Sequence, residues 1–169
     1  MNRKEKGFSL IELLIVVAII LIIAAIAIPN LLRAKIAANE SSGVGSIRTL
    51  NTASVNYFTA WNVQYPTSLA VMGGTPGGTA VCTAALLIDP VLAAATTAAA
   101  AKSGYYFTYA GATVTAAVNG CTGWQTYTII GVPANIGQSG QHGYFSDQSG
   151  VIRFSTDGSA PSVASPPLQ

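Results

Sequence analysis

Charged residues are scarce in this sequence, which has eight Lys and Arg, six Asp and Glu, and a formal net charge of +2 among 169 residues. Three of the cations and one of the anions lie in residues 1–7, so residues 8–169 carry five cations, five anions and no net charge. Such a surface offers no basic patch for nucleic acid, and it produces no long-range repulsion between copies. The composition therefore indicates no nucleic-acid partner and permits self-association.

Histidine is nearly absent, because His142 is the only one in the chain. A catalytic pair of nucleophile and base would have to be built on His142, which lies among the glycines of residues 137–143 without an accompanying motif. Those glycines have neither the spacing nor the strand-to-helix context of a phosphate-binding loop. We therefore expect a solvated loop histidine, no catalytic residue, no enzyme activity and no cofactor.

Side chains that bind metal ions are also few. Cys82 and Cys121 are the only cysteines, and with one distant histidine they make a poor zinc site. Asp147 and Asp157 are separated by a predicted strand, and two carboxylates are a thin ligand set for Ca²⁺, which takes about six to eight oxygens. We expect no metal site.

The sequence contains one long apolar run, residues 8–28, which is interrupted only by Ser9 and Glu12. As a helix rising about 1.5 Å per residue it would span about 30 Å, the thickness of the hydrocarbon core of a bilayer. The basic start and the Ala-Ile-Ala triplet at residues 25–27 also fit a secretory signal peptide. The run is longer than the roughly 7 to 15 apolar residues of such a peptide, and a membrane anchor fits its length better.

Neither a signal peptide nor a simple anchor explains Glu12. A carboxylate in a spanning helix costs roughly 2.5 to 3.5 kcal/mol on insertion scales and is by default a functional residue with a partner. Glu12 lies about one helical turn after Phe8, so its expected partner is a cation near the start of another copy of the helix. The free amine created by cleavage before Phe8 would be such a cation.

The cations Arg3, Lys4 and Lys6 predict that the N-terminus stays in the cytoplasm, so that the chain after Pro29 faces the periplasm or the outside. In that compartment Cys82 and Cys121 can form a disulfide. Two unrelated buried thiols are the other interpretation. In the chain-entropy model, closing a loop of about 40 residues stabilises the fold by roughly 4 kcal/mol.

Residues 6–20, KGFSLIELLIVVAII, followed by residues 24–29, AAIAIP, closely resemble the class III signal of type IV pilins and type II secretion pseudopilins. The resemblance covers about the first 60 residues. It implies cleavage between Gly7 and Phe8 by a prepilin peptidase, N-methylation of Phe8, and pairing of Glu12 with the N-terminal amine of a neighbouring subunit. Leu21 departs from the glycine that many relatives have there, which argues against local unwinding of the helix.

Residues 29–61 are predicted to continue the helix as an amphipathic segment on which a sheet packs, with Pro29 tolerated inside it. Gly43 and Gly45 weaken this helix by about 1 kcal/mol each relative to alanine, so they indicate a bend or a close subunit contact. The apolar positions at broadly helical spacing are Leu31, Leu32, Ile36, Val44, Ile47, Leu50, Val55, Phe58 and Trp61. The aromatic residues expected to pack under the sheet, rather than to carry electrons, are Tyr57, Phe58, Trp61 and Tyr65.

Residues 62–103 are predicted to be a variable loop region, with a short helix at residues 82–87 and a surface loop or marginal helix in the alanine run of residues 93–101. Residues 104–158 alternate with period two and are predicted to form an antiparallel meander. Its expected strands are residues 105–109, 113–118, 125–132, 144–146 and 151–155, with turns at residues 119–120 and 147–150. Residues 159–169 are predicted to be a Pro-rich tail, extended and exposed from Pro161 onward.

Together these segments predict an α+β fold: a leader at residues 1–7, an apolar helix at residues 8–28, its continuation, and a small antiparallel sheet in a pilin-like head. The predicted function is a structural subunit of a type IV pilus that supports adhesion or motility, held in the inner membrane before assembly and extracellular afterwards. Its expected partners are other copies in a helical filament, the prepilin peptidase and methyltransferase, and an inner-membrane assembly platform. The alternatives are a type II secretion pseudopilin in the periplasm, a minor pilin, or a membrane-anchored periplasmic module that never polymerises.

Overall fold

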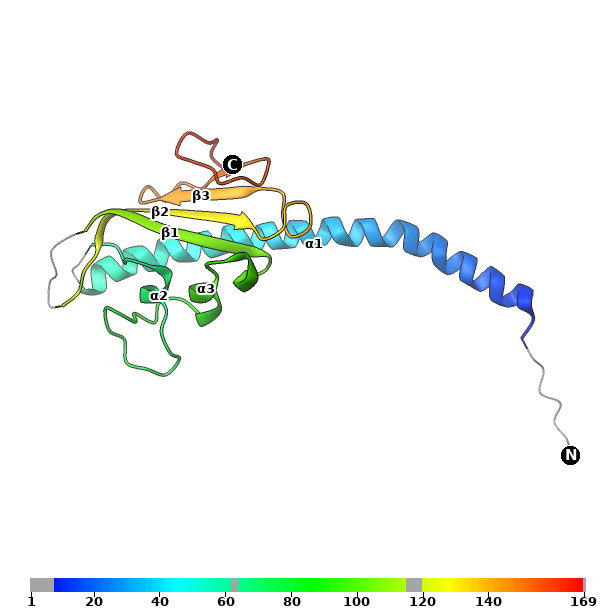
Figure 1. Ribbon diagram of the computed structural model, residues 1–169, viewed down its shortest axis with the longest axis horizontal. Coiled ribbons are helices and arrows are strands. Elements are labelled where there is room, and N and C mark those ends of the chain that lie inside the picture. Colours follow the sequence, from blue (N-terminus) through cyan, green and yellow to red (C-terminus); the bar gives the residue numbers. More distant parts are fainter. Residues whose placement is uncertain (1–7, 62–63, 115–119, 169) are drawn as a thin grey trace, which may run out of the picture. The chain divides into compact units, whose positions relative to one another are not determined.

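The computed structural model describes residues 8–61, 64–114 and 120–168 of the chain. Contacts divide the chain into two compact units, residues 1–35 and residues 36–169. The first unit contains the apolar part of one long helix. The second contains the rest of that helix together with the loops and the sheet (Figure 1).

The long helix α1 (Leu10–Trp61) has 52 residues and contains Pro29. Leu, Ile and Ala dominate its first half, and their side chains favour helix in an apolar setting where no backbone group can hydrogen-bond to water. Pro29 removes one backbone hydrogen bond and does not end the helix. The prediction of a single helix that continues through Pro29 to Trp61 is confirmed.

The buried face of α1 in the second unit follows helical spacing through Val44, Ile47, Leu50, Ala53 and Tyr57. The predicted stripe was wrong for Leu31, Leu32, Val55 and Phe58, which are 71%, 46%, 51% and 41% exposed. The buried positions rise in steps of three and four from Val44, and these steps place Ala53 and Tyr57 under the sheet instead.

The sheet has four antiparallel strands in the order β1-β2-β3-β4, so the predicted meander is confirmed (Figure 1). The strands are β1 (Tyr105–Val114), β2 (Trp124–Pro133), β3 (Gly143–Asp147) and β4 (Arg153–Ser155). The turn between β3 and β4 has Gly150 at φ +73°, as its position in residues 147–150 predicts.

The separate strands predicted at residues 105–109 and 113–118 are one strand, β1, up to Val114. The prediction of a break was wrong because the ring of Trp124 lies against Gly111, where a β-carbon would collide with it. An aromatic ring over a strand glycine replaces the missing side chain and keeps the strand paired. Residues 115–118 and Asn119 lie outside the part of the chain that the structure describes.

Residues 64–103 contain three short helices, α2 (Leu69–Met72), α3 (Pro90–Ala94) and the 3₁₀ turn η1 (Ala98–Ala100). The helix predicted at residues 82–87 is absent, and a tight turn closed by two backbone hydrogen bonds between Val81 and Ala84 stands there. The chain then pairs with the end of α2, which uses the backbone groups that a helix would need. The alanine run forms the end of α3 and η1, in agreement with a marginal helix.

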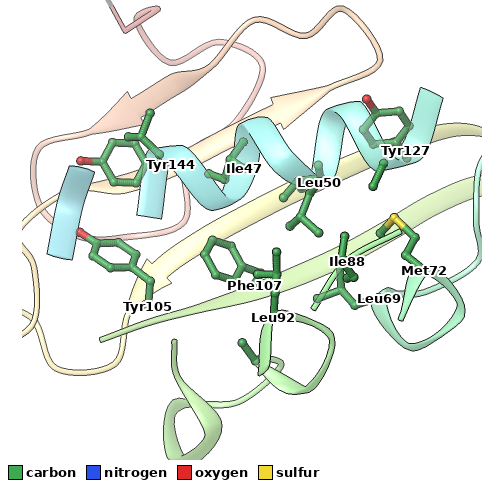
Figure 2. Packing of buried hydrophobic residues seen from close by; sticks show 14 of the residues in the cluster. Ile47, Leu50, Leu69, Met72, Ile88, Leu92, Tyr105, Phe107, Tyr127 and Tyr144 are labelled. Carbon is green, nitrogen blue, oxygen red and sulfur yellow. The ribbon is translucent and has the colours of Figure 1, made fainter. Parts of the chain in front are cut away.

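The core lies between α1, the sheet and α2 with α3 (Figure 2). Its fully buried side chains include Tyr105 and Phe107 from β1, and Ile47 and Leu50 from α1. Figure 2 shows Phe107 between Ile47 and Leu92, with the ring of Tyr105 beside it. The largest members of the core are Tyr57, Tyr105, Tyr127, Phe107, Ile47, Leu50, Met72, Leu92 and Ile129.

A hydrogen-bonded network of polar side chains fixes α1 against the sheet. The Nδ2 of Asn51 donates to Oγ of Ser146 at 2.8 Å, and Oδ1 of Asn51 accepts from the hydroxyl of Tyr127 at 3.1 Å. Ser146 in turn donates to the carbonyl of Val151 at 3.1 Å. Because every member has a partner, the network sets the position of α1 without leaving a polar group unsatisfied.

Candidate functional site

Large hydrophobic side chains are exposed from Phe8 (83% exposed), just before α1, through the apolar half of α1 to Ile28 (65%). Its most apolar 18-residue window has a mean hydropathy of 3.3, and none of that window is buried. By length and composition this helix can cross a membrane. An apolar surface of this size needs cover from lipid or from other protein chains, so it is the first candidate site.

The start of α1 is built around Glu12. Its Oε2 accepts a hydrogen bond from the backbone N–H of Ser9 at 2.9 Å, and the N–H of Leu13 bonds the carbonyl of Ser9. This is the backbone half of a capping box, in which the third helical residue reaches back to the residue before the helix. The positive end of the helix dipole also favours a carboxylate at this position.

Only one of the two carboxylate oxygens of Glu12 is used in this cap. Within the described residues, Oε1 accepts no hydrogen bond. An ionised carboxylate has room for several donors, so Glu12 is able to hold the helix start and receive a second donor at the same time. Phe8 lies one turn away, and Gly7 lies outside the described residues.

The second unit holds a contact between a carboxylate and an imidazole that the sequence did not predict. Oε1 of Glu40 on α1 lies 2.9 Å from Nδ1 of His142 and accepts from the backbone N–H groups of Gln141 at 2.8 Å and His142 at 3.2 Å. The side chains of His142 and Glu40 are 32% and 18% exposed. The prediction of a solvated loop histidine was therefore wrong, because Glu40 binds it.

Further contacts hold the same loop against α1 and β1. Nδ2 of Asn39 donates to the carbonyl of Ser139 at 2.8 Å, and the hydroxyl of Tyr105 donates to the carbonyl of His142 at 2.8 Å. The ring of Tyr105 packs flat on Gly43, whose missing side chain gives it room. Gly43 thus serves a close contact inside the subunit, while a β-carbon at Gly45 would meet nothing within 4 Å.

The predicted disulfide is present between Cys82 and Cys121, whose Cα atoms are 5.8 Å apart. It links the loop that follows α2 to the start of the β2 segment. The hydroxyl of Tyr57 donates to the carbonyl of Cys82 at 2.7 Å, so the bridge is also fixed to the end of α1. Tyr65 pairs with Trp124 through two backbone hydrogen bonds of 2.9 and 2.8 Å, which join the segment after α1 to the start of β2.

Aromatic rings join these elements at the end of α1. Tyr57 and Trp61 lie 5.0 Å apart between ring centroids, and Tyr65 meets Phe58 at 5.9 Å and Tyr127 edge-on at 4.6 Å. Tyr57 is buried and Phe58 is half-exposed, so the predicted packing under the sheet holds for only part of the set.

Burial changes the ionisation of several tyrosines in the core. Loss of solvent raises the pKa of Tyr127 to about 12, and a like effect together with the charge of Glu40 raises the pKa of Tyr144 to about 12. At the surface, Lys102 lies 2.8 Å from Asp89 and lowers the pKa of that carboxyl. Within the described residues no three His, Cys, Asp or Glu side chains gather as a metal site would require.

Comparison with known proteins singles out the first third of the chain. The prokaryotic N-terminal methylation motif matches residues 2–28. The type IV major pilin protein PilA of Myxococcus xanthus is 46% identical over 57 residues, which make up 34% of this chain and 26% of that protein. The type IV wide pilus major component of Thermus thermophilus is 64% identical over 39 residues, 23% of this chain and 30% of that protein.

A second group of relatives belongs to secretion systems. The type II secretion system core protein G of Dickeya chrysanthemi is 30% identical over 73 residues, which are 43% of this chain and 47% of that protein. The chain thus spans between 26% and 47% of the length of these curated relatives. No solved structure matches it.

The described residues thus combine a prokaryotic N-terminal methylation motif, an apolar helix long enough to cross a membrane and a four-stranded antiparallel sheet in one α+β fold. The N-terminal part of the chain is therefore similar to that of type IV pilins and of type II secretion core proteins.

Proposed function

We propose that this chain is a structural subunit of a type IV pilus, assembled from the inner membrane after its leader is removed. The observation that carries the proposal is the uncovered apolar helix, 0% buried over its most apolar window, with one carboxylate at its first turn. A lipid bilayer can cover the apolar surface and gives no reason for the carboxylate. A bundle of identical helices can cover the surface and also supply a cation for the carboxylate.

The assembly chemistry follows from the start of α1. Cleavage between Gly7 and Phe8 leaves an amine on Phe8, which N-methylation keeps basic. In a filament, this amine on one subunit donates to Oε1 of Glu12 on a neighbour, while Oε2 remains on the N–H of Ser9. The carboxylate then has a partner of opposite charge in an apolar interior, where an unpaired charge is costly.

Register is the main contribution of this pair. Moving the helix from lipid into a filament core gains little hydrophobic free energy, since both surroundings are apolar. Side-chain packing must hold the helices together, and an apolar surface alone permits many offsets along the axis. The charged pair selects one of these offsets. Pro29 leaves one backbone carbonyl of α1 without its usual partner and gives a point at which the helix can bend during packing.

The partners in this proposal are other copies of the chain, a prepilin peptidase with its methyltransferase, and an inner-membrane assembly platform. The assembled filament serves surface adhesion or motility. We propose no catalytic role for the chain itself. The relatives that are type II secretion core proteins favour a second candidate, a pseudopilin whose short filament remains in the periplasm.

One experiment separates these candidates. Cells producing the chain are sheared, and the protein is measured in the sheared filaments and in the membrane fraction with an antibody against the head. A type IV pilin gives abundant sheared filaments. A pseudopilin or minor pilin stays with the cells although its leader is removed. A membrane-anchored module that never polymerises gives processed or unprocessed chain in the membrane and no filament under the electron microscope.

A further inference from the structure

The last residues of the chain lie along the outer edge of β4 as an added strand. The N–H of Leu168 donates to the carbonyl of Ile152 at 2.7 Å, and the N–H of Phe154 donates to the carbonyl of Pro166 at 3.0 Å. Between these two bonds Arg153 and Pro167 stand opposite each other in an antiparallel bridge. The prediction of an extended and exposed tail from Pro161 onward was therefore incomplete, because residues 165–168 close this edge.

A side-chain contact holds the added strand in place. Nη1 of Arg153 donates to the carbonyl of Ser165 at 2.9 Å. The chain turns just before this point, where the N–H of Ser165 bonds the carbonyl of Ser162 at 3.0 Å. Arg153 therefore anchors the tail at the residue where the pairing begins.

Pro166 and Pro167 make the tail a poor partner for a further β-strand. In the observed bridge the backbone groups of Pro167 point away from β4, and proline has no N–H to offer on that side. The backbone nitrogen of Pro166 points toward β4 but carries no hydrogen, so it cannot donate to the carbonyl of Phe154. Prolines on edge strands are a known protection against pairing between sheets.

Without the tail, β4 would present an open edge. The N–H of Phe154 and the carbonyl of Ile152 would lose their hydrogen-bond partners, and the half-buried ring of Phe154 would lose its contact with the tail while keeping its contact with the core. Pro166, Pro167 and Leu168 of the tail line an open hollow of about 410 Å³ together with Phe154, so removal of the tail would leave the Phe154 side of this apolar hollow for a second strand to bury. Residues 8–169 carry no net charge, so copies do not repel one another at long range.

We propose that the edge of β4 is an interaction surface for a second copy of this chain, and that the chain's own residues 165–168 keep it closed. The partner strand is β4 of the other copy, because two identical edges can pair antiparallel about a twofold axis. If the chain also forms filaments, every subunit repeats this edge. Once the tail is removed, weak pairings between the opened edges of neighbouring filaments would add up to lateral bundling.

The test removes the tail and asks whether copies associate. A chain ending after Ala164 is compared with the full chain in the same detergent micelles by sedimentation, and the exchange of the Phe154 amide is measured by mass spectrometry or NMR. The proposal predicts that this amide exchanges about fivefold to tenfold faster and that the shortened chain forms a dimer. Adding a synthetic peptide of residues 162–169 in excess should return it to the size of the full chain.

Two variants complete the design. Val163→Ser changes an exposed side chain of the tail outside the paired residues and should behave as the full chain does. Leu168→Pro keeps the length of the chain and removes the N–H that donates to the carbonyl of Ile152. If the shortened chain does not fold, this variant takes its place, and we expect it to form the dimer and to exchange the Phe154 amide faster. A folded, shortened chain that stays at the size of the full chain overturns the proposal. So does a Phe154 amide that keeps its protection without the tail.

The micelle measurement does not require filaments, so it can fail or succeed apart from the proposed function. Where filaments form, electron microscopy adds a second readout. The shortened chain should give filaments in ordinary yield that lie side by side in bundles, and the peptide should disperse them. Loss of filaments in every variant, including Val163→Ser, would count against the filament function. The size of the shortened chain in micelles would then decide whether the edge of β4 pairs with a second copy.

Discussion

The carboxylate of Glu12 caps its own helix, with Oε2 accepting the N–H of Ser9 at 2.9 Å. If Glu12 acted only through a partner in another subunit, it would not cap the helix of its own chain. This contact orients the carboxylate before assembly, so less side-chain freedom is lost when a second donor arrives. The cap and the proposed pair between subunits thus use different oxygens of one side chain.

Replacing Glu12 by Gln separates the two roles. Glu12→Gln keeps an acceptor for the N–H of Ser9 and removes the charge, whereas Glu12→Ala removes both. We expect both variants to lose their leader normally and to give at least about tenfold fewer sheared filaments, because a neutral amide is a weaker partner for an amine. The measurement is the amount of chain in sheared filaments together with its N-terminal mass. Normal filament yield from Glu12→Gln would mean that capping is the whole role of this residue.

Gly43 and Gly45 make a matched pair for testing the packing of α1. Gly45→Ala should raise the free energy of unfolding by about 0.5 to 1 kcal/mol, since nothing lies within 4 Å of the new β-carbon and alanine favours helix. Gly43→Ala places its β-carbon 3.1 Å from Cγ of Tyr105, a ring that is buried and held by its hydroxyl bond to His142.

We expect Gly43→Ala to be less stable than Gly45→Ala by about 1 to 3 kcal/mol, the usual cost of overpacking. Denaturant unfolding of the full chain in detergent, followed by tyrosine and tryptophan fluorescence, measures both. Equal stabilisation by the two substitutions would show that the ring of Tyr105 moves freely.

Removal of the disulfide should destabilise the head. Cys82 and Cys121 are 39 positions apart in the sequence, and for this loop the chain-entropy model gives a loss of about 4 kcal/mol for Cys82→Ala with Cys121→Ala. Tyr57→Phe removes only the hydroxyl bond to the carbonyl of Cys82 and should cost about 1 kcal/mol. Chemical denaturation of the three chains gives both values. A double variant as stable as the parent would contradict the structural role of the bridge.

Alkaline pH should unfold the head through its buried tyrosines. The fold raises the pKa of Tyr127 and Tyr144 from 10.0 to about 12, so the folded state keeps protons that the unfolded state loses. Their contribution to stability is complete below pH 10.0 and falls as the pH rises through about 12, by about 1.4 kcal/mol per unit for each tyrosine. Tyrosinate absorbance and circular dichroism recorded together test this. Full ionisation near pH 10 with an intact fold would contradict it.

Much of the fold could be predicted because its signals are local. The unbroken apolar run after Phe8 indicates a helix of membrane length, and period-two alternation indicates the strands of the head. The pairing of Cys82 with Cys121 could be predicted because the chain has no other cysteines and the charges of residues 1–7 predict an oxidising compartment for the residues after Pro29.

The features that could not be predicted depend on contacts between distant residues. Glu40 and His142 are 102 residues apart, and nothing in either sequence neighbourhood shows that the register of the sheet brings them together. The break expected within β1 was wrong because Trp124, paired with the far end of that strand, covers Gly111. The pairing of the tail with β4 uses backbone groups alone, and these leave no pattern in the side chains.

In the proposed assembly, the chain is cut before Phe8 and built into a filament through the apolar helix α1 that follows. Intact-mass spectrometry of sheared filaments tests this most directly. We expect an abundant species that begins at N-methylated Phe8 and is two hydrogens lighter than the reduced chain, because of the bridge between Cys82 and Cys121. A chain that still carries residues 1–7, or filaments that contain no species beginning at Phe8, would contradict it.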